Sequence, residues 1–164
     1  MSKLEKAAYL SIIIVCMLAA YVLIGTMHVG RANSNTVSTS QMIGKKLSLP
    51  SSDWSSARTN LVIAMSSHCR FCLASTPFYR QLADAANKDD SGKTLTVVST
   101  ESHDITQGFL MDHKIHVSRI FESSLAGLGI RGTPTILVVN SEGTIKRVYL
   151  GKLTAQEEQE VLAQ

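Results

Sequence analysis

Cysteine is scarce in this chain of 164 residues, which has only three, at positions 16, 69 and 72. So few cysteines exclude a small scaffold held together by several disulfides. Cys69 and Cys72 form a Cys-x-x-Cys pair, and no second pair of this kind is present. A zinc site with four cysteine ligands is therefore excluded as well. The pair remains available for thiol chemistry.

A strong excess of charge is also absent, because 16 Lys and Arg stand against 13 Asp and Glu, for a net charge of +3. Residues 1–30 contribute +1 through Lys3, Glu5 and Lys6, which leaves 3 − 1 = +2 for residues 31–164. A domain that binds nucleic acid normally shows a basic patch or stripe. We therefore predict no nucleic-acid partner.

One long apolar run is present near the N-terminus, since residues 7–27 contain no charged side chain. Twenty-one helical residues at about 1.5 Å each span roughly 30 Å, the thickness of a hydrocarbon core. A cleaved signal peptide would have a shorter apolar region of about 7–15 residues. We predict a short tail over 1–6 and an uncleaved transmembrane anchor over 7–27. This anchor is the predicted contact with the membrane.

The segment after the anchor is polar and rich in Ser, Thr and Asn, and over 28–44 it shows no periodicity. Such a composition is typical of a flexible linker. A folded domain is then expected over 45–164. The basic residues that flank the anchor are almost evenly divided, and the short N-terminal tail favours a cytoplasmic N-terminus. The domain would then lie on the extracytoplasmic side, periplasmic or outer, where disulfides form.

Two apolar runs in the predicted domain, at 60–65 and 94–99, are typical of strands that are buried on both faces. A third strand is expected after Pro134, because proline cannot donate to the ladder and so precedes a strand. The turn at 140–143 predicts a hairpin to the last strand, at 144–150. A mixed sheet in an α/β sandwich is therefore expected.

Helical spacing of apolar residues predicts one helix over 69–87, with Pro77 inside it as a kink. A second helix is expected to begin at Asp104. Thr154 and Glu157 have the spacing of a capping box at the start of a terminal helix. Helices thus separate the strands of the first half, while a hairpin joins those of the second half.

Cys69 and Cys72 lie at the start of the predicted helix over 69–87. Their spacing places both sulfurs on one face of the first turn, close enough to bridge. The positive end of a helix dipole lowers the pKa of a thiol there below its free value of about 8.5. His68 and Arg70 would lower the pKa of Cys69 further, unless both side chains point to solvent. The pair therefore predicts a redox-active dithiol.

Several features occur together around this dithiol. A buried strand leads into Cys69-Arg-Phe-Cys72, Pro77 follows eight residues after Cys69, and Thr133-Pro134 precedes a long strand. In this combination the chain resembles the thioredoxin fold, a three-layer α/β/α sandwich with a mixed central sheet. With its N-terminal anchor it is similar to the TlpA/ResA-like membrane-anchored thiol–disulfide oxidoreductases.

The resemblance implies that Cys69 is the attacking cysteine and Cys72 the resolving one. It also implies that Pro134 is a cis-proline beside the dithiol and that Thr133 offers its backbone to a substrate. The expected function is an enzyme that exchanges disulfides with extracytoplasmic proteins in the reducing direction, with no cofactor besides its own Cys69–Cys72 disulfide. A membrane dithiol partner would regenerate it, and cytochrome c maturation is a possible setting.

The chain departs from the family pattern at three positions near the dithiol. His68 stands where an aromatic residue is common before the first cysteine. Ile63 and Ser75 stand at positions where members of the family can hold acidic residues. The resemblance therefore identifies no carboxylate that would deprotonate Cys72, and a slow resolving step is one expectation.

Two other functions are compatible with the same residues. His113 and His116 have metal-compatible spacing, and together with the two cysteines they could form the site of a copper-binding thioredoxin-fold metallochaperone. Alternatively, the chain could be a thioredoxin-like binding module with weak redox activity, because the buried acidic residues are missing.

Overall fold

The computed structural model describes residues 13, 15–18, 40–50, 52–88 and 90–164. The chain divides into two units, Met1–Ser38 and Thr39–Gln164. The predicted tail over 1–6 and most of the predicted anchor over 7–27 lie outside the described residues. In the part of the chain that is described, no helix is both long and apolar enough to cross a bilayer.

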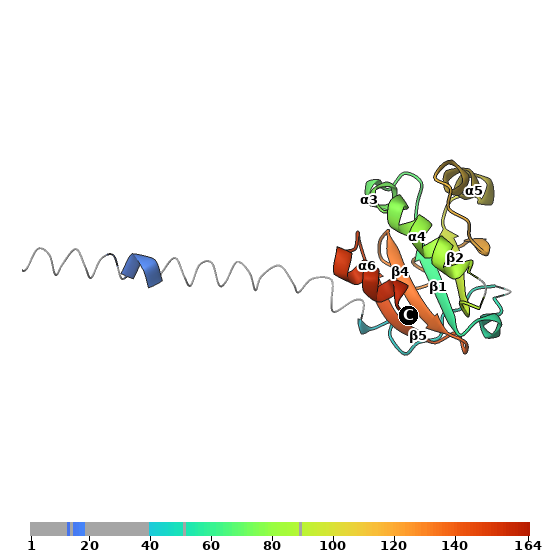
Figure 1. Cartoon of the computed structure of the whole chain (residues 1–164), viewed down its shortest axis with the longest axis horizontal. Helices are drawn as coiled ribbons and strands as arrows, with labels where there is room; N and C mark the ends of the chain where they lie inside the picture. Colours follow the sequence, from blue (N-terminus) through green and yellow to red (C-terminus); the bar gives the residue numbers. More distant parts are fainter. Residues whose placement is uncertain (1–12, 14, 19–39, 51, 89) are drawn as a thin grey trace, which may run out of the picture. The chain divides into compact units, whose positions relative to one another are not determined.

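A five-stranded mixed sheet with the strand order β3-β2-β1-β4-β5 organises the second unit (Figure 1). Strands β1, β2 and β3 are parallel, while β4 is antiparallel to both β1 and β5. The central position of β1 follows from its composition, because the side chains of residues 61–64 are fully buried on both faces. The strands are β1 Thr59–Ala64, β2 Lys93–Ser99, β3 Arg119–Glu122, β4 Thr135–Asn140 and β5 Ile145–Leu150.

Two consecutive helices, α3 Arg70–Ala74 and α4 Thr76–Ala86, replace the single helix expected over 69–87. Pro77 lies in the first turn of α4, where the missing N–H of proline costs no hydrogen bond. The prediction of one kinked helix was therefore wrong. Pro77 is the second residue of α4, and Ser75 separates the two helices.

Two further helices complete the unit, α5 His103–Asp112 and α6 Ala155–Leu162. Helix α5 begins at His103, and its N-cap is Ser102, two residues before the expected N-cap Asp104. Helix α6 has the predicted capping box, in which Thr154 and Glu157 bond each other's backbone N–H.

The two faces of the sheet are covered differently. One face packs against helices, and its core contains Leu82 of α4, Leu110 of α5 and Val161 of α6. Figure 1 shows α4 and α6 together over the sheet, and the two helices contact each other. The other face packs against irregular segments and the short 3-10 helix η1, Trp54–Ser56. Among the described residues, α-helices therefore cover only one face of the expected α/β/α layering.

The folded unit begins before residue 45, so the predicted linker over 28–44 extends too far. Met42 belongs to the core, and the Gly44 N–H donates to the Ile145 carbonyl oxygen at 2.8 Å. One isolated bridge, between Lys46 and Thr144, follows. Within residues 40–46 only the Met42 side chain is buried, and one buried apolar residue is too little for a periodic pattern in the sequence.

Candidate active site

The loop after β1 brings Cys69 to the start of α3, where it is the N-cap residue, with φ −82° and ψ 114°. Its sulfur accepts the backbone N–H of Cys72 at 3.4 Å, as the oxygen of a serine or aspartate does at other N-caps. The Cys69 thiol in turn donates to the carbonyl oxygen of Thr133 at 3.3 Å. Both cysteines are free thiols in this structure.

The pKa of Cys69 lies below the ordinary value of a free thiol. Partial burial of the thiol raises the pKa, but hydrogen bonds with Thr133, Cys72 and the Phe71 backbone outweigh this effect. Two of these hydrogen bonds come from backbone N–H groups in the first turn of α3, as expected for a thiol at the N-terminus of a helix. Hydrogen bonds that favour the charged form therefore make Cys69 the better nucleophile.

Cys72 has the opposite character. Its side chain is fully buried, and this burial raises the pKa to about 12. The neighbouring Cys69 raises it further, while a hydrogen bond with the Ser66 backbone lowers it. The two thiols are thus divided into an accessible one that ionises easily and a buried one that does not. This division is what an attacking and a resolving cysteine require.

The Thr133–Pro134 peptide bond is cis, as the resemblance implied. The hydrogen bond from Cys69 places the Thr133 carbonyl oxygen directly beside the dithiol, although 64 residues separate the two positions. Pro134 itself is buried at the start of β4, which pairs with β1. The sheet therefore brings together the two segments on which the resemblance was based.

Glu101, which the sequence analysis did not single out, holds the loop that leads into Cys69. Its carboxylate accepts hydrogen bonds from the Ser66 hydroxyl at 2.7 Å and from the Ser67 backbone N–H at 2.9 and 3.0 Å. The His68 Nδ1 lies 3.0 Å from the same carboxylate. Burial raises the pKa of Glu101, but these hydrogen bonds outweigh it and lower the pKa to about 2. A signal existed, because Glu101 follows β2, and neighbouring parallel strands end at the same edge of a sheet.

His68 and Arg70 flank Cys69 in the sequence but have other partners in the structure. The exposed ring of His68 pairs with Glu101. The Arg70 guanidinium lies over the ring of Phe71, with its carbon 4.6 Å from the ring centroid. Phe71 and Leu73 are both about half exposed beside the dithiol. The proposed tuning of the Cys69 pKa by His68 and Arg70 stays a prediction.

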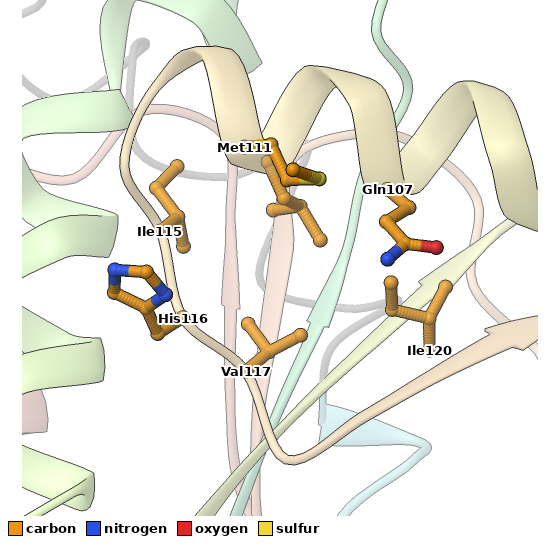
Figure 2. A pocket seen from close by; sticks show the side chains of 7 residues that line it. Gln107, Met111, Ile115, His116, Val117 and Ile120 are labelled. Carbon is orange, nitrogen blue, oxygen red and sulfur yellow. The ribbon is translucent and has the colours of Figure 1, made fainter.

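The histidines of the copper hypothesis lie around α5. The His113 ring stacks on Phe109 at 4.4 Å between centroids, and its Nδ1 lies 2.8 Å from the Phe109 carbonyl oxygen. His116 lines a small hollow of about 180 Å³ between α5 and β3, beside Ile115 and Val117 (Figure 2). Among the described residues, no three His, Cys, Asp or Glu side chains are grouped to hold a metal ion. The geometry therefore gives the copper hypothesis no support.

Comparisons with known proteins were made at the level of sequence and of structure. No protein-family model matches the chain, and a search of curated proteins finds no match. Solved structures do match. StoA from Bacillus subtilis is 20% identical with a TM-score of 0.52, over 64% of this chain and 82% of that one. A thiol:disulfide interchange protein from Bacteroides sp. is 22% identical with a TM-score of 0.56, over 73% and 82%.

A third similar structure is the thioredoxin domain of a thiol-disulfide oxidoreductase from Bacteroides vulgatus. It is 22% identical with a TM-score of 0.52, over 66% of this chain and 79% of that one. At these identities the likeness establishes the fold. The structural neighbours of the chain are thioredoxin-fold thiol–disulfide oxidoreductases, and its own α/β domain with a mixed five-stranded sheet has the thioredoxin fold.

Proposed function

We propose that the chain is a thiol–disulfide oxidoreductase that acts on protein disulfides through Cys69 and Cys72. One observation carries the proposal: the two thiols differ in both exposure and acidity. Cys69 is partly exposed with a lowered pKa, while Cys72 is fully buried with a pKa of about 12. A structural pair of thiols has no need of this difference, whereas stepwise disulfide exchange does.

In the reducing direction, the Cys69 thiolate attacks one sulfur of a substrate disulfide and expels the other as a thiolate. Cys72 then loses its proton and attacks the Cys69 sulfur of the mixed disulfide. This releases the second substrate thiolate and forms a Cys69–Cys72 disulfide. The substrate gains two electrons and the dithiol loses two, so a dithiol donor must restore the reduced form. We place that donor in the membrane and the substrates on the extracytoplasmic side.

Reduction of insulin disulfides by the full-length protein tests the proposal. Wild-type protein with a thiol reductant should precipitate insulin faster than the reductant alone, and Cys69→Ser should abolish the difference. If the wild type is no faster than Cys69→Ser, the chain is better described as a thioredoxin-like binding module.

The direction of exchange is a separate question, which the reduction potential of the Cys69–Cys72 couple decides. A potential near that of thioredoxin, about −270 mV, corresponds to a reductant, and one near −120 mV to an oxidant. We expect the reductant value. The potential is measured by equilibrating the full-length protein with thiol–disulfide buffers of known ratio.

A further inference from the structure

Tyr79 presents a buried hydroxyl that the proposed reaction has not used. The residue lies in α4, its side chain is 1% exposed, and it belongs to the same core cluster as Cys72. Its hydroxyl makes no well-formed hydrogen bond with any residue that the structure describes. A buried polar group without a partner costs free energy, so an unpaired hydroxyl beside a reacting sulfur calls for an explanation.

The position of Tyr79 follows from the helix geometry. Cys72, Ser75 and Tyr79 are spaced three and four residues apart, and all three are buried. Ser75 uses its hydroxyl proton for the Phe71 carbonyl oxygen at 2.8 Å. Its hydroxyl therefore has no proton left for Cys72. Tyr79 carries the remaining hydroxyl proton of this set, and the Ser75 hydroxyl and the Cys72 sulfur are its polar neighbours.

We propose that the Tyr79 hydroxyl donates a hydrogen bond to the Cys72 sulfur when that sulfur becomes a thiolate, and so promotes the resolving step. This inference deepens the proposed function by assigning a residue to the deprotonation of Cys72. Tyr79 acts through Cys72 and does not itself contact the substrate.

The protonation state of Tyr79 determines which role it can take. Burial raises the pKa of Tyr79 far above its ordinary value, the nearby Cys72 raises it further, and the weaker opposing effect of Ser75 does not offset this. The hydroxyl therefore keeps its proton under all conditions in which the dithiol reacts. Tyr79 is thus a donor to the thiolate and not the base that removes the proton from Cys72. The Cys72 proton leaves to solvent or to the departing substrate thiolate.

The surroundings of Cys72 offer few other groups for this task. The Ser66 backbone and the Thr133 side chain lower its pKa, whereas the Cys69 thiol raises it, and burial outweighs the two lowering contacts. Ile63, at a position where an acidic residue was considered, is an apolar core residue of β1. A neutral hydroxyl thus takes the place of a carboxylate, at lower cost of burial.

The aromatic disulfide dithiobis(nitrobenzoate) separates the two steps in the full-length protein. Attack by Cys69 releases one coloured thiolate, and attack by Cys72 on the mixed disulfide releases a second. Cys16 is an exposed third thiol, so all variants carry Cys16→Ser. Tyr79→Phe should slow the second phase about tenfold or more, as expected for a hydrogen bond to a charged group. The first phase should keep its rate.

Tyr149→Phe is the matched control, because Tyr149 also has a buried hydroxyl without a partner among the described residues and packs against the same core. It lies on β5, which β4 separates from β1. Tyr149→Phe should leave both phases unchanged. Tyr79→Phe keeps the ring and removes only an unpaired group, and an unchanged first phase reports that its fold is intact.

The pH profile of the second phase gives a further readout. Its rate rises with the thiolate fraction of Cys72, so Tyr79→Phe should move the profile to higher pH. Equal second phases in the parent and Tyr79→Phe, or equal slowing in Tyr149→Phe, would overturn the inference. Dithiobis(nitrobenzoate) is small and reacts with the dithiol without protein recognition. Failure to reduce insulin would therefore refute the proposed function on protein substrates, but it would leave the inference about Tyr79 to be decided by the two phases.

Discussion

The most direct test of the site architecture is the substitution Glu101→Gln. Glutamine keeps the size of the side chain, but only one of its two terminal atoms, the oxygen, accepts hydrogen bonds. It therefore cannot accept all the hydrogen bonds that the Glu101 carboxylate makes with Ser66, Ser67 and His68. The Glu101 side chain is only 13% exposed, so solvent screens these interactions little. We therefore expect a clear loss in the free energy of unfolding.

The pKa of Glu101 sets the size of that loss. It falls from 4.5, the ordinary value, to about 2 in the folded protein. The difference of about 2.5, at 1.36 kcal/mol per tenfold change, corresponds to on the order of 3 kcal/mol. Because the folded-state pKa is the lower one, this stability is present above about pH 4.5. It is lost as the pH falls through that value towards about 2.

Urea unfolding of full-length protein at several pH values between 7 and 2 measures the effect. The difference between wild type and Glu101→Gln should be largest at neutral pH and shrink towards pH 2. Glu142→Gln is the control, since the Glu142 side chain is 73% exposed and its pair with Lys46 is 4.0 Å long. A difference for Glu101→Gln that stays constant down to pH 2 would refute the reasoning.

Further predictions concern the thiols and two turns of the fold. Cys72→Ser should accumulate a mixed disulfide between Cys69 and substrate, visible on non-reducing gels, whereas no adduct should form in Cys69→Ser. In a Cys16→Ser background, iodoacetamide should modify Cys69 with a midpoint below pH 9.0 and leave buried Cys72 unmodified. Gly143→Ala should destabilise the fold by more than about 1 kcal/mol in urea, because φ is +78° and an added Cβ would lie 2.7 Å from Trp54. Thr154→Ala should cost about 1 kcal/mol in the same assay through loss of the capping box.

The sheet could be predicted because its signals are local. The apolar runs at 60–65 and 94–99 lie within one residue of β1 and β2, since strands buried on both faces are continuous in hydrophobicity. The hairpin before β5 and the capping box at Thr154 depend on neighbouring residues only. Such patterns are complete within a few positions of the sequence.

The features that the sequence did not reveal depend on neighbours in space. In a sequence, a proline in the middle of a helix and a proline in the first turn of a helix look alike. Only the break at Ser75 in the structure shows that Pro77 lies in a first turn, that of α4. Glu101 reaches the dithiol loop from the next strand, 34 residues after Ser67. Tyr79 occupies an apolar position of α4, where an aromatic side chain is an ordinary core residue. A role for its hydroxyl follows only from the position of the Cys72 sulfur, which the sequence does not give.

The chain enters the folded unit at the end of the sheet that lies opposite the dithiol. Gly44 and Leu47 bond backbone groups of Ile145 and Gly143, at the end of the sheet where Thr59 begins β1. The dithiol follows the other end of β1. The six residues of this strand, at about 3.3 Å each, separate the two ends by roughly 20 Å. Tension on the upstream chain would thus load the hairpin of β4 and β5 first. Cys69, the accessible thiol, thus lies at the opposite end of β1 from the point where the chain enters the fold.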